Sequence, residues 1–216
     1  MNQTFRFSKQ LSFGEEIGNA VTHAISSLLM LILLPISAIY SYNHGGMIQA
    51  VGVSIFIVSL FLMFLSSTIY HSMSYGSLHK YILRIIDHSM IYIAIAGSYT
   101  PVVLTLMNNW LGYLILTIQW GTTAFGILYK IFAKKVNEKF SLTLYLIMGW
   151  LVVIIFPAIV SQTGSAFWLL MLAGGLSYSI GAIFYAQKRP YFHMIWHLFI
   201  ILASLLQYGA IVFCMN

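Results

Sequence analysis

The sequence consists of long apolar runs separated by short polar breaks. Seven of these runs hold about 20 mainly apolar residues each, the length of helix that crosses the hydrocarbon core of a bilayer. The predicted spans are residues 20–40, 47–71, 82–107, 111–132, 142–160, 166–186 and 192–214. Because no break is long enough to fold by itself, we expect one all-α membrane domain over residues 1–216, a bundle of seven transmembrane helices.

The composition indicates the same fold class. Hydrophobic residues make up 60% of the chain and charged residues only 6%, which excludes a water-soluble domain of this length. The single cysteine, Cys214, excludes an intrachain disulfide. The segment before the first span is too long and too acidic for the start of a signal peptide, so we expect the first span to be retained.

The positive charges predict how the bundle is oriented. All ten Lys and Arg residues fall in the N-terminal arm or beside every second break: Arg6, Lys9, Lys80, Arg84, Lys130, Lys134, Lys135, Lys139, Lys188 and Arg189. Cytoplasmic segments of membrane proteins carry an excess of Lys and Arg, so we expect a cytoplasmic N-terminus and an extracellular C-terminus. The formal charge of +6 then reflects membrane topology, and no nucleic-acid partner is expected.

Two histidines open the last predicted span. His193 and His197 stand at i and i+4, so both imidazoles project from one helical face, about 6 Å apart along the axis. This spacing lets two side chains share one metal ion. The alternative is that both histidines lie at the membrane interface and reach toward lipid headgroups.

Ser67 and His71 form a second i, i+4 pair, at the cytoplasmic end of the second span. His71 would supply a third imidazole at the depth of His193 and His197, and three His ligands with an open fourth position are typical of a catalytic zinc site. The serine alone is better explained by a hydrogen bond to the carbonyl one turn earlier in its helix, as is usual for serine in membrane helices.

Asp87 is the only acidic residue inside a predicted span. An ionised carboxylate within the bilayer needs a strong partner, such as a metal ion or a water molecule bound to it. Alternatively, Asp87 could cap the third span or pair with Arg84. His88 faces about 100° away from Asp87, and His44 and His79 fall in predicted loops, so none of these three is expected to be a ligand.

Polar residues also share one face at the start of the first span. Glu16, Asn19 and His23 follow i, i+3, i+7 spacing, and they could orient a metal-bound imidazole. Glu15 is better explained by the preference of helix starts for acids. All these candidates obey one rule, since they lie at the starts of odd spans or the ends of even spans, and therefore at the same side of the membrane.

Small residues in two spans predict close helix contacts. They are Gly121 and Gly126 in the fourth span and Gly174, Gly175, Ser177 and Gly181 in the sixth.

Together these motifs resemble the hemolysin III family, the bacterial branch of the progestin and adipoQ receptor group. The resemblance lies in STIYH at 67–71, Asp87, HMIWH at 193–197 and the E-x2-N-x3-H run at 16–23, and it covers essentially the whole chain. It implies a Zn²⁺ ion held by His71, His193 and His197, with a water molecule contacted by Asp87 and Ser67. It also links the chain to the CREST-type membrane hydrolases, which include alkaline ceramidases, and implies a bacterial cell membrane.

Three functions fit this sequence. The first is a zinc-dependent hydrolase that acts on a lipid amide or ester at the inner leaflet, with a role in membrane lipid homeostasis. The second is a pore-forming cytolysin, although polar residues do not recur along the spans as a channel requires. The third is a membrane sensor or receptor whose metal is structural. Membrane lipids are the expected partners, and the sequence leaves open whether the bundle forms a homo-oligomer.

Overall fold

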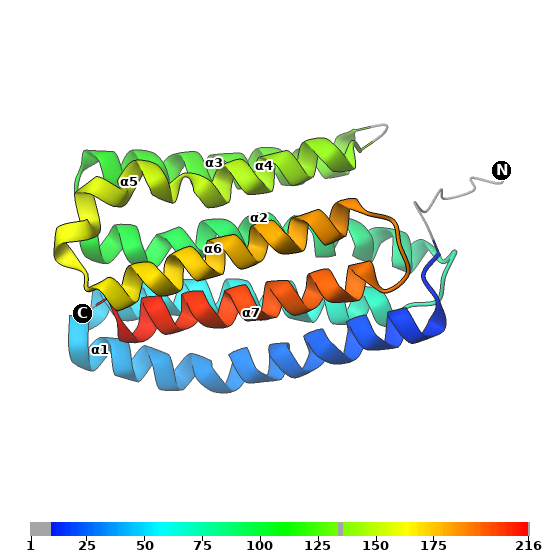
Figure 1. Ribbon diagram of the computed structural model, residues 1–216, viewed down its shortest axis with the longest axis horizontal. Helices are drawn as coiled ribbons and strands as arrows, with labels where there is room; N and C mark the ends of the chain where they lie inside the picture. Colours follow the sequence, from blue (N-terminus) through cyan, green and yellow to red (C-terminus); the bar gives the residue numbers. More distant parts are fainter. Residues whose placement is uncertain (1–9, 134–135, 216) are drawn as a thin grey trace.

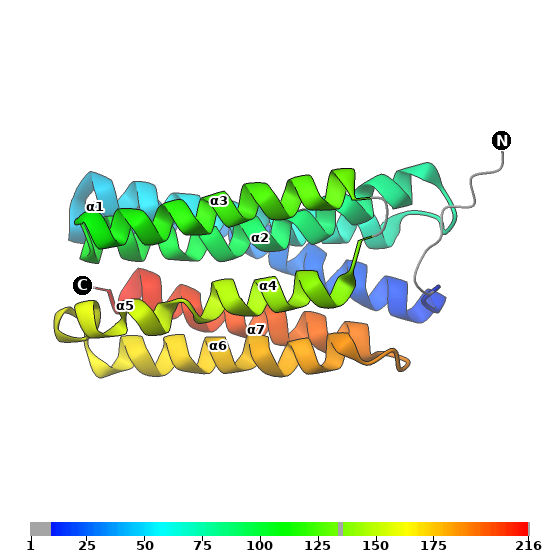
Figure 2. The same ribbon diagram turned by 90° about the horizontal axis from the view of Figure 1, so that it is seen from above.

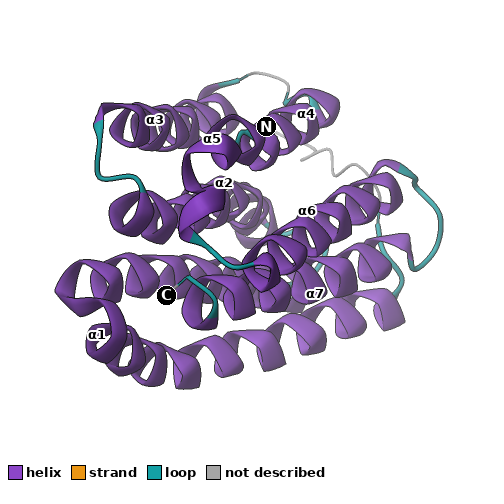
Figure 3. Cartoon of the chain, turned by 60° about the vertical axis from the view of Figure 1, so that its left-hand side comes forward, coloured by secondary structure: helices purple, strands orange, loops and turns teal. Residues whose placement is uncertain are grey.

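The computed structural model describes residues 10–133 and 136–215, and every regular element among them is helical (Figure 3). The elements are α1 (Phe13–Ser72), α2 (Leu78–Leu106), α3 (Trp110–Phe132), α4 (Glu138–Trp150), α5 (Val152–Ile159), the 3-10 turn η1 (Val160–Gln162), α6 (Ser165–Ala186) and α7 (Phe192–Phe213). These residues contain six helical stretches long and apolar enough to cross a membrane, with Glu138–Gln162 counted as one stretch.

The first two predicted spans lie in one helix that folds back on itself. α1 is 60 residues long, and its only non-helical backbone in this range is at Gly46, with φ 75° and ψ −167°. A residue with a Cβ rarely adopts this conformation, which glycine permits. Figure 1 shows the two arms of α1 running in opposite directions from a turn at the left of the view. This fold explains why six stretches are found where the hydropathy pattern predicted seven, and it places His44 in a helix and not in a loop.

α2 begins earlier than the predicted third span. Ser77 is its N-cap and accepts a hydrogen bond from the backbone N–H of Lys80. Asp87 therefore lies more than two turns inside the helix, so the suggestion that it caps the span is wrong. His79 is also helical, in contrast to its predicted place in a loop.

The predicted span 142–160 is broken at Leu151, between α4 and α5. Side chains from neighbouring helices bind the carbonyl groups beside the break. The Tyr99 hydroxyl donates to the carbonyls of Met148 and Gly149, both at 2.8 Å, and Gln119 Nε2 donates to Met148 at 2.9 Å. An irregular backbone inside a membrane protein needs such partners, because lipid offers none.

Figure 2 shows α2, α3 and the second arm of α1 in one layer and α4 to α7 in another, while the first arm of α1 slants from the first layer toward α7. α1 packs against α2 and α7, α6 packs against α7, and α3 packs against α2. The interior is filled largely by the second arm of α1, where Val53, Phe56, Ile57 and Phe64 are completely buried.

Some of the glycines predicted to lie at close helix contacts do so, and one does not. A Cβ on Gly126 would lie 2.5 Å from the Tyr92 ring, and one on Gly181 would lie 2.9 Å from Phe199 Cβ. Gly126 and Gly181 therefore allow neighbouring helices to approach closely. A Cβ on Gly121 would meet no atom of the described chain within 4 Å, so its assignment as a packing position is wrong.

The ends of α1, α3 and α6 and the starts of α2, α4 and α7 gather at one end of the bundle, at the right of Figure 1. The other connections and the end of α7 lie at the opposite end. The Lys and Arg residues that the structure describes all belong to the first end: Lys80, Arg84, Lys130, Lys139, Lys188 and Arg189. Arg6, Lys9, Lys134 and Lys135 lie outside the described residues.

Candidate metal centre

The structure brings three imidazoles together at the end that carries the positive charges. One potential ligand nitrogen from each of His71, His193 and His197 lies within 4.8 Å of the other two. The ring centroids are 5.2 Å apart for His71 and His193, 5.1 Å for His71 and His197, and 4.7 Å for His193 and His197. His71 ends α1 and the other two occupy the first two turns of α7, so the fold joins ligands separated by more than 120 residues. The three histidines are placed to hold a metal ion.

The hydrogen bonding of these imidazoles fits a metal. His71 Nε2, His193 Nε2 and His197 Nδ1 are buried and have no hydrogen-bond partner within residues 10–133 and 136–215. A buried polar atom without a partner costs about 1–3 kcal/mol, and three such atoms make that cost large. A cation coordinated by the three nitrogens would satisfy all of them. Neutral imidazoles suit several transition metals, so the ligand set alone does not fix which metal binds.

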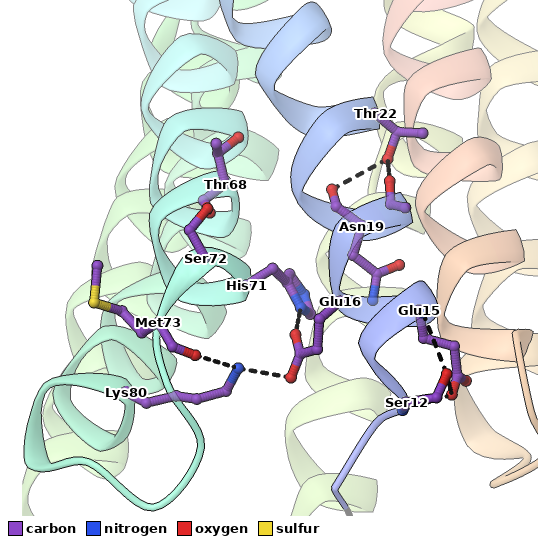
Figure 4. A network of polar contacts seen from close by, with 11 residues as sticks. Ser12, Glu15, Glu16, Asn19, Thr22, Thr68, His71, Ser72, Met73 and Lys80 are labelled. Carbon is purple, nitrogen blue, oxygen red and sulfur yellow. Dashed lines mark hydrogen bonds and ion pairs between the residues drawn. The ribbon is translucent and has the colours of Figure 1, made fainter.

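A carboxylate from the start of α1 orients His71 (Figure 4). His71 Nδ1 lies 2.6 Å from Glu16 Oε2, and the Lys80 ammonium donates to Glu16 Oε1 at 2.6 Å. Lys80 is only 2% exposed, and it also donates to the carbonyl of Met73 at 3.1 Å. If Nδ1 donates its proton to Glu16, Nε2 is left as the free acceptor that a metal requires.

Asn19 and His23 continue the polar face of α1 above Glu16. The His23 ring stacks on His197 with centroids 3.8 Å apart and planes 6° apart, and its edge meets Phe64. Both ring nitrogens of His23 and both amide atoms of Asn19 are buried without a hydrogen-bond partner in the described part of the chain. His23 thus lies against a candidate ligand but is not a member of the three-histidine group.

Asp87 and Ser67 line a small void beside the imidazoles. The void has a volume of about 10 Å³ and is bounded by His23, His197, Asp87 and Ser67 together with Met63, Ile91, Trp196 and Ile200. This is roughly the space of one water molecule. The Ser67 hydroxyl is buried beside the Asp87 carboxylate, which is buried as well. Arg84, the alternative partner considered for Asp87, donates to Glu138 Oε1 at 2.6 Å.

A much larger cavity adjoins this void. It has a volume of about 300 Å³, lies between α2, α4, α5, α6 and α7, and shares Met63, Ile91, Trp196 and Ile200 with the void. Trp196 and Gln207 both line it and are eleven residues apart on α7, which corresponds to about 16 Å along the helix. Its walls are mainly apolar side chains. Two wall residues, Val153 and Leu172, are 59% and 52% exposed, so the cavity extends to the outer surface between α5 and α6.

Sequence reasoning missed two features of this region. Lys80 was interpreted only as a topological charge, although it is buried against Glu16. The cavity left no sequence signal, because its walls come from several helices that are distant in the sequence. His88, whose ring lies edge-on to Tyr185 with centroids 6.5 Å apart, is outside the three-histidine group, as expected.

The matching family model and two similar bacterial proteins all point to one protein family. Residues 11–208 match the family described as "Haemolysin-III related". The chain is 43% identical to "Hemolysin-3 homolog" of Bacillus subtilis, over 92% of this chain and 93% of the relative. It is 41% identical to "Hemolysin-3" of Bacillus cereus, over 92% of this chain and 91% of the relative. It is 28% identical to human "Monocyte to macrophage differentiation factor", over 91% of this chain and 83% of the relative. No solved structure matches the chain.

Proposed function

The chain belongs to the haemolysin-III-related family, and we propose that it is a zinc-dependent membrane hydrolase that cleaves an amide or ester bond of a lipid. The observation that carries the proposal is the adjacency of two features. Three imidazoles, of which those of His71 and His197 are buried and that of His193 is half-buried, present buried nitrogens without a hydrogen-bond partner in the described chain, and an apolar cavity of about 300 Å³ begins at the residues beside them. Such an enzyme would adjust the lipid composition of its own membrane.

The proposed topology is seven crossings with a cytoplasmic N-terminus and an extracellular C-terminus, in the plasma membrane of a bacterium. The fold of α1 at Gly46 supports the additional crossing, since each arm holds more than 20 residues. The gathering of the described Lys and Arg residues at one end of the bundle supports the orientation. The metal site would then lie near the inner leaflet.

His71, His193 and His197 would hold the metal. Zn²⁺ suits three neutral nitrogen ligands with a fourth position left open, and when bound it would supply a Lewis acid that activates water near neutral pH. With the proton of His71 on Nδ1, Glu16 would accept it and leave the opposite nitrogen, Nε2, free to bind the metal.

Asp87 and Ser67 would transfer the proton and stabilise the substrate during the reaction. The Asp87 carboxylate, at the edge of the small void, would accept the proton of the attacking water and later deliver it to the leaving amine or alcohol. The Ser67 hydroxyl would donate to the carbonyl oxygen of the substrate as negative charge develops there. The adjoining cavity would bind the acyl chain and exclude bulk water from the reacting bond.

The test is hydrolysis by the purified protein in lipid nanodiscs that contain an N-acyl sphingoid amide or a lysophospholipid ester. We expect turnover that requires Zn²⁺ and is abolished in Asp87→Asn, which leaves the three imidazoles in place. His88→Ala, a histidine outside the group, is the matched control and should retain activity. Equal turnover in the wild type and Asp87→Asn would remove Asp87 from the mechanism, and absence of turnover on both lipid classes would contradict the hydrolase.

Cytolysis is the second candidate, because the names of both Bacillus relatives include hemolysin. The largely apolar walls of the cavity do not favour an aqueous pore, which needs polar groups along its length. Leakage of a dye from vesicles that contain the purified protein, unchanged after removal of the metal, would support the cytolysin over the hydrolase.

A further inference from the structure

Two adjacent glutamates at the start of α1 make contacts with different parts of the fold. Glu16 is directed at His71 and Lys80, whereas Glu15 lies on the other side of the helix, toward Ser12 (Figure 4). Consecutive residues of a helix project about 100° apart, so one short segment can contact two neighbouring elements. Sequence analysis explained Glu15 only by its place in the first turn.

Glu15 is bonded on both carboxylate oxygens. Oε2 accepts from the backbone N–H of Ser12 at 3.0 Å and from its hydroxyl at 2.8 Å, and Ser12 Oγ accepts from the Glu15 N–H at 3.3 Å. This reciprocal capping box closes the start of α1. Oε1 accepts from the backbone N–H of Tyr191 at 2.6 Å, a contact across 176 positions of sequence.

Tyr191 is the residue on which α7 begins. It is the N-cap of α7, and its φ of 61° lies in the left-handed region, which is uncommon for a residue with a Cβ. Among the described residues the Tyr191 side chain makes no capping hydrogen bond, while the Tyr191 carbonyl accepts the first helical bond, from Ile195 at 3.0 Å. A carboxylate at this point accepts a hydrogen bond from the backbone N–H of Tyr191. Its negative charge also interacts favourably with the positive, N-terminal end of the α7 dipole.

The packing around this bond is close. A Cβ on Gly18 would lie 2.5 Å from Met194 Sδ, and one on Gly14 would lie 3.5 Å from the Tyr191 hydroxyl. The first turns of α1 therefore lie directly against the first turn of α7. Glu15 is only 4% exposed, so its buried negative charge is stabilised mainly by the hydrogen bonds from Ser12 and Tyr191.

We propose that Glu15 is a positioning residue that fixes the start of α7, and with it His193 and His197, relative to His71. Glu16 orients the ligand from α1, and Glu15 holds the helix that carries the other two ligands. The paired glutamates thereby set the geometry of the three imidazoles from one rigid turn. The part of this proposal that concerns metal affinity rests on the proposed metal site, whereas the anchoring of α7 by Glu15 does not.

The experiment compares Glu15→Ala with Ser12→Ala. Both variants break the reciprocal capping box, since Ser12→Ala removes the contacts of the hydroxyl and Glu15→Ala those of the carboxylate. Only Glu15→Ala also removes the bond to Tyr191, so Ser12→Ala is the matched control. The first measurement is hydrogen–deuterium exchange over residues 187–193 in the metal-free protein. The second is the dissociation constant for Zn²⁺, obtained by competition with a chelator.

We expect faster exchange over residues 187–193 in Glu15→Ala and wild-type exchange in Ser12→Ala. The dissociation constant should rise about 10-fold or more in Glu15→Ala and stay within about 3-fold in Ser12→Ala, the range expected for a partner that orients metal ligands. Glu15→Gln retains an oxygen that can accept a hydrogen bond from Tyr191. Its exchange and its dissociation constant for Zn²⁺ should therefore lie close to the wild-type values.

Equal exchange in Glu15→Ala and Ser12→Ala would overturn the proposal, as would a Glu15→Gln variant no better than Glu15→Ala. Should Glu15→Ala fail to fold, Glu15→Asp replaces it under the same criteria, because it keeps a carboxylate in the first turn but is one methylene too short for Tyr191. A wild-type protein that binds no Zn²⁺ contradicts the proposed function, and the exchange comparison still decides whether Glu15 anchors α7.

Discussion

His71 Nδ1 and Glu16 Oε2 lie 2.6 Å apart, although 55 residues separate them in the sequence. The contact closes the two arms of α1 at the end opposite their turn at Gly46. The other oxygen of Glu16 accepts from the buried Lys80 ammonium, so α1 and α2 are joined at the same carboxylate. A candidate metal ligand is therefore held by a residue that itself has a buried cationic partner.

Loss of this carboxylate should weaken metal binding. In Glu16→Gln we expect the dissociation constant for Zn²⁺ to rise about 10- to 100-fold, because an amide no longer stabilises the Nδ1–H of His71 as a carboxylate does. Chelator competition on the purified protein measures the effect. Glu138→Gln is the control, since Glu138 pairs with Arg84 and Lys188 away from the imidazoles, and equal losses in both variants would contradict the role of Glu16.

Metal removal should lower stability. A ligand that binds only the folded state at 100 times its dissociation constant adds about 2.7 kcal/mol, so chelation should reduce the thermal midpoint of the wild type. His193→Ala should be insensitive to the chelator, because one of the three nitrogens is missing. Thermal unfolding in detergent with and without chelator provides the measurement. A chelator-independent midpoint in the wild type would count against a metal that couples α1 to α7.

Filling the large cavity should impair lipid turnover without affecting the metal. Ala94 lines the cavity and is 6% exposed, so Ala94→Phe places a ring where an acyl chain is proposed to bind. We expect turnover of a long-chain substrate to fall about 10-fold, equivalent to roughly 1.4 kcal/mol, with unchanged zinc content. Leu176→Phe, at a residue of α6 that is 47% exposed and does not line the cavity, should behave as the wild type. Comparable turnover in both variants would place the substrate elsewhere.

Two glycines of α3 should respond differently to the same substitution. Gly126→Ala brings a methyl group to within 2.5 Å of the buried Tyr92 ring, and overpacking of this kind typically costs about 1–3 kcal/mol. Gly121→Ala meets no described atom within 4 Å and should be neutral or slightly stabilising. The difference between the thermal midpoints of the two variants measures the effect. A Gly121→Ala variant as unstable as Gly126→Ala would contradict the packing described for α2 and α3.

Much of the site followed from local sequence patterns. Helical periodicity placed His193 and His197 on one face of α7, and the alternation of spans placed His71 at the same end of the bundle. The apolar runs located the helices to within several residues. Such features depend on composition and on spacing within one helix, which a sequence displays directly.

Other features depend on contacts between distant segments. Lys80 carries a topological signal in the sequence, and only packing shows that it is buried against Glu16. The bond from Tyr191 to Glu15 requires a left-handed residue before α7, for which the Pro190-Tyr191 dipeptide gives no pattern. The cavity is lined by residues of several helices that are distant in the sequence, so no local pattern reveals it.

The most direct test of the metal centre is elemental analysis of protein purified without chelators and without a metal-affinity tag. The arrangement of His71, His193 and His197 predicts about one zinc ion per chain in the wild type and almost none in His197→Ala, while His88→Ala keeps the wild-type content. A wild-type protein without stoichiometric metal, or equal metal content in the wild type and His197→Ala, would contradict the account.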